Sequence, residues 1–397
     1  MRRRAAILGV VVLGAWPAAA RADGYFAEWP IGLQSDVVRI ARTFPGEFSL
    51  YVKDLSDGSR YTYNSATPMY LASGIKIAVM VALFKKMERG ETNLEKELVY
   101  REDHVRDGAP LLSYLRVGTP VSLKILLEAM IQQSDNAATD MIIEHVGLDK
   151  VNLTLVEEGV FGFGPITTLL DVRRRMYREL DPRTERFTPM ELAIIGATTP
   201  VEARVAKVVE LLGEPPGRYK LPDFDDAAER YYATGANTAS IEAMAGLVEN
   251  IVRGKVVSAE ASRKMVEVML GTETGAARIR GGLPINIPLA HKTGTQYRRI
   301  GDFGVFFLSG NRAVLFAAAV KGGKSQRQAE EVIGKIANRT YWHLLTPEEQ
   351  EALTKRPKPV VEEDEEELTE DKPPPPPPPA AGKAIRPKKK KKELPEE

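Results

Sequence analysis

The chain has 397 residues, 43% of them apolar, which is enough to bury a large core and to form two compact subdomains. Its formal net charge is +1, so the composition gives no reason to expect nucleic acid as a partner. The absence of cysteine excludes disulfides, a cysteine nucleophile, a lipid-modified cysteine anchor and thiolate metal sites. The four histidines are scattered along the sequence, so we also expect no metal centre and no cofactor.

The N-terminus has the pattern of a secretory signal peptide. Three arginines after Met1 lead into an apolar run, Ala5 to Trp16, and small residues follow before a cut after Ala20 or Ala22. The run is too short for a permanent membrane anchor, and no other segment is long and apolar enough to be one. Residues 1–22 therefore predict a periplasmic or secreted protein that has no transmembrane anchor once mature.

The first part of the mature chain predicts a helix, a hairpin and a second helix. Gln34 to Arg42 can form a short amphipathic helix. Glu47 to Lys53 and Arg60 to Tyr63 read as two strands of a hairpin, with a tight Asp-Gly turn between them. The segment from Ile75 to Met87 then reads as a mostly buried helix.

Ser73 stands at the start of that second helix, and Lys76 lies three residues further, on the same face. A serine hydroxyl is a poor nucleophile near neutral pH, but an amine whose pKa is lowered by burial can take its proton. The helix N-terminus also favours negative charge that develops beside Ser73. The pair fits an acyl-transfer nucleophile, although taken alone it is better explained by a capping serine followed by a snorkelling lysine.

The middle of the chain, from Thr167 to Tyr232, is strongly helical in pattern. Thr188 and Thr199 each precede a proline and a glutamate in the order that begins a capped helix. The run Arg173-Arg174-Arg175 is interpreted as a solvated helix face rather than a nucleic-acid site. Four further helices are predicted, at Ser122 to Gln132, Ala137 to Glu144, Ser240 to Gly254 and Ser258 to Gly271.

The C-terminal part predicts three strands, a closing helix and a tail. The strands are Ile287 to Lys292, Phe303 to Leu308 and Ala313 to Val320, and the helix is Ser325 to Leu344. Residues 353–397 contain an acidic block, a proline run and a lysine run, so we expect them to be disordered. This tail is either a solvated tether or a basic tip that contacts anionic polymers of the cell envelope.

Three short motifs stand in order along the chain, each at the end of a predicted element. They are Ser73-x-x-Lys76, Ser134-Asp135-Asn136 and Lys292-Thr293-Gly294. Chance easily explains the Ser-x-x-Lys motif, but it explains the other two motifs, and the ordered set of three, poorly. The set resembles the active-site serine hydrolases that include class A β-lactamases and penicillin-binding proteins. The resemblance covers roughly residues 37–344.

The resemblance implies four catalytic residues. Ser73 would attack the lactam or amide carbonyl, and Lys76 would help to remove its proton. Ser134 would relay a proton to the departing nitrogen. Lys292 would supply positive charge for the substrate carboxylate.

The resemblance also implies residues that bind the substrate. Asn136 would hydrogen-bond the side-chain amide of the substrate and help to hold Lys76, and Thr293 would offer a hydroxyl to the substrate carboxylate. The backbone N–H groups of Ser73 and Thr295 would form the oxyanion hole. Gly294 would let the substrate backbone come close to the strand.

One feature departs from the class A pattern. Those enzymes carry a Glu-x-x-Leu-Asn segment whose glutamate activates the deacylating water. The nearest stretch here, Tyr177 to Pro182, places Tyr177 where the glutamate would be, and Glu179 would serve only if the loop were rebuilt. The interval between the second and third motifs is also longer than in compact class A enzymes, and the surplus is helical. Acylation is therefore better supported than turnover.

The sequence thus predicts an α/β (α+β) fold with an antiparallel sheet flanked by helices and an all-helical subdomain. The folded domain would span residues 23–352, with a sheet part at 33–67 and 236–345 and a helical part at 68–235. The first functional hypothesis is a secreted class A-type hydrolase of β-lactams. The alternatives are a D,D-peptidase-like or other cell-wall amidase or esterase, and a tethered sensor that is acylated once. We expect a monomer whose partner is a small β-lactam or a cell-wall peptide.

Overall fold

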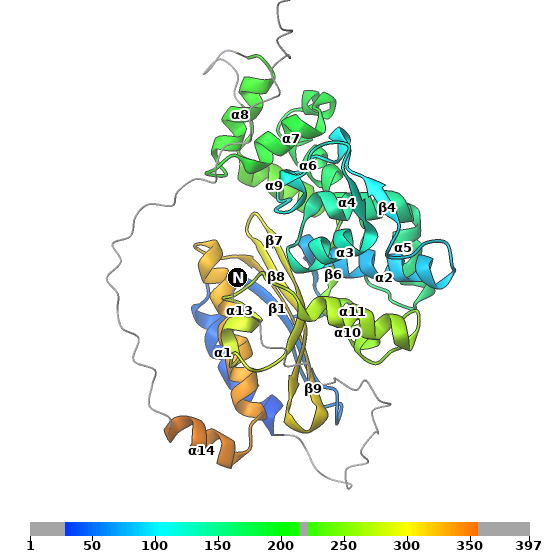
Figure 1. Ribbon diagram of the computed structural model, residues 1–397. Coiled ribbons are helices and arrows are strands. Elements are labelled where there is room, and N and C mark those ends of the chain that lie inside the picture. The colour runs from blue at the N-terminus through cyan, green and yellow to red at the C-terminus, as the bar shows by residue number, and fades with distance from the viewer. Residues whose placement is uncertain (1–27, 215–220, 356–397) are drawn as a thin grey trace, which may run out of the picture. The chain divides into compact units, whose positions relative to one another are not determined.

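The computed structural model describes residues 28–214 and 221–355, so the predicted signal peptide and residues 356–397 of the predicted tail lie outside the described residues (Figure 1). The last described helix, α14 (Pro347–Lys355), includes residue 353, where the sequence predicts the tail to begin. No helix within the described ranges is long and apolar enough to cross a membrane.

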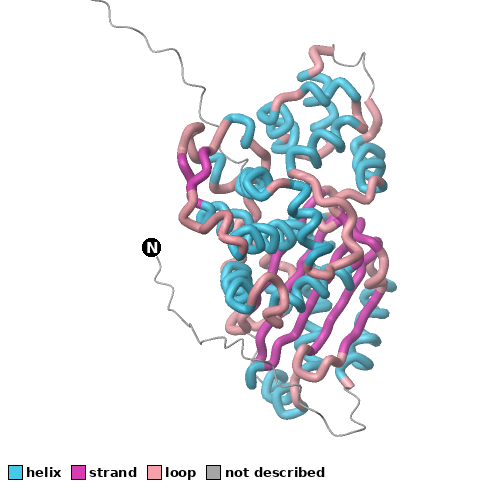
Figure 2. Tube along the Cα trace, turned by 90° about the vertical axis from the view of Figure 1, so that its right-hand side faces the viewer, coloured by secondary structure: helices cyan, strands magenta, loops and turns pink. Residues whose placement is uncertain are grey.

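The centre of the fold is a five-stranded antiparallel sheet in the order β2-β1-β9-β8-β7, whose strands lie side by side in Figure 2. The strands come from both ends of the folded chain, so the hairpin near the N-terminus pairs with the C-terminal strands. Their bounds are β1 (Gly46–Asp54), β2 (Arg60–Tyr63), β7 (Leu289–Gln296), β8 (Arg299–Leu308) and β9 (Arg312–Gly322).

Helices cover both faces of this sheet. Alternate residues of β1 point to opposite faces: Leu50 joins a core with α1 (Trp29–Thr43) and α13 (Gln326–Leu344), and Tyr51 joins the core on the other face. That second core includes α2 (Lys76–Glu88), α10 (Ile241–Val252) and α11 (Ala259–Leu270). Because helices cover both faces, the long strands β8 and β9 are buried along nearly their whole length.

Most of the remaining helices lie between α2 and α10 in the chain, and some of them enclose a third core. This core contains the buried Tyr177 and Tyr231 together with Tyr70 and Ala72, which directly precede Ser73. The bounds are α3 (Leu123–Gln132), α4 (Asn136–Val146), α5 (Leu148–Glu157), α6 (Leu169–Arg178), α7 (Pro189–Ala197), α8 (Ala203–Leu211), α9 (Phe224–Ala233) and α12 (Ile279–Gly282).

Short elements complete the fold. β3 pairs with β6, and β4 pairs with β5, each as a small antiparallel ladder. Their bounds are β3 (Pro68–Tyr70), β6 (Thr238–Ser240), β4 (Glu97–Val99) and β5 (Pro120–Ser122). The single 3-10 turns are η1 (Ala72–Ile75), η2 (Glu102–His104), η3 (Leu112–Tyr114), η4 (Pro182–Arg186) and η5 (Ser309–Asn311).

The observed architecture confirms the predicted fold class. The capping box at Thr188 is present, since its hydroxyl accepts the Glu191 N–H and the Glu191 carboxylate accepts the Thr188 N–H. The similar prediction at Thr199 is wrong. α8 begins only at Ala203, because residues 200–202 form a turn in which the Ala203 N–H bonds to the Pro200 carbonyl.

Candidate active site

Ser73 lies in the 3-10 turn η1, which runs directly into α2. Its neighbours anchor the turn in two different cores: Leu71 belongs to the core on the sheet, and Ala72 to the core of the helical part. Ala72 has a φ of +48°, a conformation that costs an alanine free energy and is often found at functional sites. The serine is therefore presented by a backbone that the surrounding packing holds in a strained shape.

Strand β7 approaches this turn so closely that position 294 must be glycine. A Cβ atom built on Gly294 would lie 2.2 Å from the Leu71 carbonyl oxygen. The sequence explained this glycine by the approach of a substrate backbone. The structure gives a different physical reason, the packing of β7 on the chain before Ser73.

The amine of Lys76 is enclosed by the second motif. Its Nζ donates to the Ser134 carbonyl oxygen at 2.5 Å and to Asn136 Oδ1 at 2.8 Å, and it lies 3.3 Å from Ser134 Oγ. Lys292 Nζ donates to the same Ser134 Oγ at 2.9 Å and to the Thr293 carbonyl at 3.0 Å. The three motifs thus meet, with the Ser134 hydroxyl between two lysine amines.

Burial makes both amines unusually acidic. It lowers the pKa of Lys76 to about 7, although the carboxylates of Asp135, Asp140 and Asp107 oppose the shift. Burial, with the neighbouring charge of Lys76, also lowers the pKa of Lys292 well below its usual value. A large fraction of Lys76 is therefore neutral near pH 7, as a proton acceptor must be.

The low pKa of Lys76 also means that this residue destabilises the folded state. An unfolded lysine titrates near 10.5, so holding this amine at about 7 costs the fold on the order of 5 kcal/mol below pH 7. The cost falls as the pH rises from 7 and is gone above about 10.5. Below pH 7 Lys76 therefore destabilises the fold, and favourable packing elsewhere in the chain offsets this cost.

Asp135 and Asn136 hold the second motif in shape. Asp135 caps α4 through the Ala138 N–H at 2.8 Å, and its other oxygen accepts the N–H groups of Leu111 and Leu112 at 3.0 Å. Asn136 Nδ2 donates to the Asp107 carbonyl at 2.8 Å, which aims its Oδ1 at Lys76. Asp135 is thus a structural residue, although its charge opposes the pKa shift of Lys76.

Strand β7 presents Thr295, the residue after the third motif, to the solvent, whereas Thr293 within the motif is buried. Thr293 is buried and its hydroxyl lies 2.6 Å from that of Thr274. Thr295 is exposed, and Arg278 donates to its hydroxyl at 2.5 Å while also binding Glu330. The sequence gave no indication of Arg278, which stands outside all three motifs.

A cavity of about 40 Å³ lies beside Ser73, and we call it the Ser73 cavity. It is too small to hold more than about one water molecule. No aspartate or glutamate stands among the described residues that line it, which are Tyr70, Ala72, Ser73, Ile75, Asn136, Leu169, Val172, Arg173, Asn237, Thr295 and Gln296. Three of the predicted site residues, Ser73, Asn136 and Thr295, therefore line the same cavity. Three more, Lys76, Ser134 and Lys292, are connected to Asn136 by hydrogen bonds.

The interpretation of the arginine run as a solvated helix face is wrong for Arg173. Its side chain is only 12% exposed and forms a buried ion pair with Asp107, to which both Nε and Nη2 donate. Burial alone would lower the pKa of Arg173, but the Asp107 carboxylate outweighs burial and raises it. The helical spacing contained the signal, because residues 169, 172, 173 and 176 fall on one face of α6.

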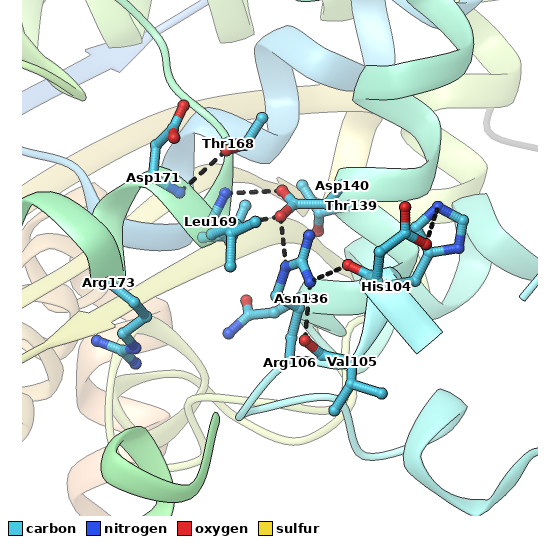
Figure 3. A network of polar contacts seen from close by, with 12 residues as sticks. His104, Val105, Arg106, Asn136, Thr139, Asp140, Thr168, Leu169, Asp171 and Arg173 are labelled. Atoms are coloured by element: carbon cyan, nitrogen blue, oxygen red, sulfur yellow. Dashed lines mark hydrogen bonds and ion pairs between the residues drawn. The ribbon is translucent and has the colours of Figure 1, made fainter. Parts of the chain in front are cut away.

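A polar network fixes the helix that carries Arg173 (Figure 3). Asp140 accepts the backbone N–H groups of Leu169 and Leu170 at 2.7 and 2.9 Å and the Nε of Arg106 at 2.7 Å. Thr168 caps the helix through the Asp171 N–H at 3.0 Å. Because Asp140 and Asn136 both lie on α4, the network ties α6 to the second motif.

Neither Tyr177 nor Glu179 reaches the Ser73 cavity. Tyr177 is fully buried in the third core, where burial raises its pKa and its hydroxyl has no hydrogen-bond partner among the described residues. Glu179 binds Arg230 Nε at 2.9 Å. The same part of the chain instead places Leu169, Val172 and Arg173 beside Ser73.

Replacing Arg173 by methionine should lower the free energy of unfolding by about 3 kcal/mol, because Asp107 is left charged and buried. Urea denaturation of the folded domain measures this loss. Arg175→Met, at an exposed position of the same helix, is the matched control and should change stability by less than about 0.5 kcal/mol. Equal stability of both variants would contradict a structural role for the Arg173–Asp107 pair.

Within the described residues, no group of three or more histidine, aspartate and glutamate side chains is placed to hold a metal ion. The fold and the three assembled motifs define the class of proteins that contains class A β-lactamases and penicillin-binding proteins. The chain belongs to the beta-lactamase enzyme family, whose family model matches residues 32–344.

Individual relatives are distant in sequence. The chain is 22% identical to a carbapenem-hydrolyzing beta-lactamase, KPC, of Klebsiella oxytoca, over 75% of this chain and 84% of that protein. Among solved structures, PBP-A superposes with a TM-score of 0.59 at 22% identity, over 78% of this chain and 94% of that one. A beta-lactamase from Chitinophaga pinensis gives 0.59 at 20% identity, over 78% of this chain and 98% of that one. These structural likenesses establish the fold.

Proposed function

We propose that the protein is a secreted serine hydrolase that β-lactams and related amides acylate on Ser73, with hydrolysis of the acyl-enzyme as the slow step. The observation that carries the proposal is the buried amine of Lys76, with its pKa of about 7, held against Ser134 and Asn136 beside the Ser73 cavity. The signal-peptide pattern of residues 1–22 supports the export of the protein.

The proposed acylation follows from this arrangement. The Ser73 hydroxyl gives its proton to the neutral Lys76 amine while its oxygen bonds to the carbonyl carbon. The negative charge on the carbonyl oxygen is accepted by the backbone N–H groups of Ser73 and Thr295. The carbon–nitrogen bond then breaks, and the nitrogen takes a proton from the Ser134 hydroxyl. Ser134 recovers its proton from a neighbouring lysine, to which it is already hydrogen-bonded.

No carboxylate among the described residues that line the Ser73 cavity is available as a general base for deacylation. Hydrolysis of the ester on Ser73 needs a water molecule and a group that takes its proton. The described lining of the Ser73 cavity offers the amide of Asn136, the apolar Leu169 and Val172, and the guanidinium of Arg173, none of which is a base. We therefore expect the acyl-enzyme to outlive the acylation step.

The missing carboxylate favours a second candidate function, a D,D-peptidase-like or other amidase that acts on cell-wall peptides. Its first half-reaction is the same. A linear peptide releases its amine after acylation, whereas an opened β-lactam keeps its amine tethered in the site and so hinders the entry of water. The sensor hypothesis and the envelope contact of the tail stay predictions. Deleting residues 353–397 and measuring how much of the protein is retained in the cell envelope would test the contact of the tail.

Exposure of the purified domain to a chromogenic β-lactam tests the proposal through intact mass and colour together. We expect one adduct per chain in the wild type, and the loss of at least about 99.9% of the labelling rate in Ser73→Ala. Ser309→Ala, at an exposed serine in η5 between β8 and β9, is the control and should label normally. Undiminished labelling of Ser73→Ala would overturn the assignment of the nucleophile.

A further inference from the structure

A second cavity, of about 670 Å³, adjoins the Ser73 cavity, and Arg173, Thr295 and Gln296 line both. It extends past the hairpin residue Arg298 to the N-terminus of α13, where Lys324 lines it. We call it the basic cavity. Its volume suits a substrate-sized group, which the Ser73 cavity cannot hold.

The lining of the basic cavity carries an excess of positive charge. Four basic side chains, Arg173, Arg204, Arg298 and Lys324, face a single acidic one, Glu202. Two of these four basic side chains already form an ion pair with a carboxylate. Arg173 pairs with Asp107, and Arg298 pairs with Asp225 at 2.9 Å.

The other two cations have no carboxylate partner within residues 28–214 and 221–355. Arg204 is 9% exposed and donates only to backbone carbonyls, those of Gly196 at 2.6 Å and Thr198 at 3.1 Å. Lys324 is exposed and forms no ion pair with another described residue. Burial lowers the pKa of Arg204, although the charge of Asp107 opposes the shift. An anion in the cavity would supply the missing counter-charge.

The N-terminus of α13 adds to this preference. Ser325 caps this 19-residue helix, and both Ser325 and Gln326 line the cavity. A helix N-terminus carries partial positive charge and favours a nearby anion. Basic side chains and the helix end thus give the cavity the same preference.

The direction of β7 indicates which part of the substrate enters the basic cavity. Lys292, early in the strand, bonds to Ser134, the residue that protonates the departing nitrogen in the proposed reaction. Gln296 and the hairpin that follows lie at the opposite end of the strand, where the basic cavity opens. The portion that reaches this cavity is therefore on the acyl side of the scissile bond.

We propose that the basic cavity binds a carboxylate carried by the acyl chain of the substrate, so that the preferred substrates are amides with an anionic acyl portion. This inference rests on the proposed function, and it names the substrate class of the same site. A peptide whose acyl side carries a free carboxylate has this chemistry.

Two matched penicillins test the inference. Both carry an adipic acid side chain, with the terminal carboxylate free in one and converted to the carboxamide in the other. Intact mass measures the second-order rate constant of acylation for each at low ionic strength. We expect the carboxylate compound to react about five-fold faster with the wild type, as one well-placed ion pair allows. Added salt should shrink the difference.

Variants separate the cavity from general charge effects. In Lys324→Gln the ratio of the two rate constants should fall toward one, and in Lys324→Glu it should fall below one. Lys124→Gln, at an exposed lysine of α3 outside the cavity lining, should keep the wild-type ratio. A ratio of one in the wild type, or a ratio unchanged by both Lys324 variants, would overturn the inference.

Equilibrium binding of the two penicillins to the Ser73→Ala variant tests the basic cavity independently of acylation. We expect the carboxylate penicillin to bind this variant about five-fold more tightly than the carboxamide. If neither compound labels the wild type but this preference in binding persists, the proposed function fails and the cavity assignment stands. Equal binding of both compounds overturns the cavity assignment.

Discussion

Replacing Lys76 by methionine should lower the rate constant for acylation of Ser73 by about 1,000-fold, the contribution typical of a positioned general base. Methionine fills much of the same buried volume but cannot accept a proton. The variant also removes the cost of burying an amine, which limits any loss of stability. Intact mass with the chromogenic β-lactam gives the rate, and thermal unfolding confirms that the variant is folded.

Two further variants make this result specific. Lys86→Met carries the same replacement on the same helix, where the lysine lies 3.6 Å from Glu91, and should acylate at the wild-type rate. Lys76→Arg should stay as slow as the methionine variant, because a guanidinium remains protonated. Acylation of Lys76→Met within ten-fold of the wild type would exclude Lys76 as the base.

A carboxylate introduced beside Ser73 should convert slow deacylation into turnover. Leu169 lines the Ser73 cavity and is the first residue of α6, where the helix N-terminus keeps a carboxylate ionised. We expect Leu169→Glu to raise the deacylation rate constant by about 100-fold, since a general base typically contributes this much. The decay of the isolated acyl-enzyme, followed by mass, measures the change.

Leu169→Gln is the matched control, because glutamine has nearly the same shape as glutamate but no basic oxygen. It should deacylate like the wild type. If both variants deacylate at the same rate, the shortage of a base in the Ser73 cavity does not limit turnover. A wild-type acyl-enzyme that decays as fast as it forms would point to the same conclusion.

The sequence predicted several helices correctly because strong local signals mark where they begin. The sequence places helix starts at Ser122, Ser240, Ser258 and Ser325, and each of these serines caps its helix by accepting the N–H three residues further. Strand boundaries were less accurate. β7 continues to Gln296, four residues beyond the predicted end at Lys292, because pairing with β8 rather than local propensity determines its length.

The sequence failed where long-range contacts decide the role of a residue. Arg173 looked solvated because it begins a run of three arginines, yet its partner Asp107 is 66 residues away in the chain. Glu179 looked like a candidate base, but its ion pair with Arg230 crosses 51 residues. Neither pairing leaves a local pattern, so only the folded chain shows which side chain faces Ser73.

The pH dependence of acylation tests the central claim, that a neutral Lys76 activates Ser73. Because burial lowers the pKa of Lys76 to about 7, the amine is protonated and inactive below that pH and free to accept a proton above it. The rate constant for formation of the Ser73 adduct, measured by intact mass from about pH 5 to about pH 9, should rise with a midpoint near 7 and then level off. A rate that is independent of pH across this range, or that falls as the pH rises through 7, would contradict the claim.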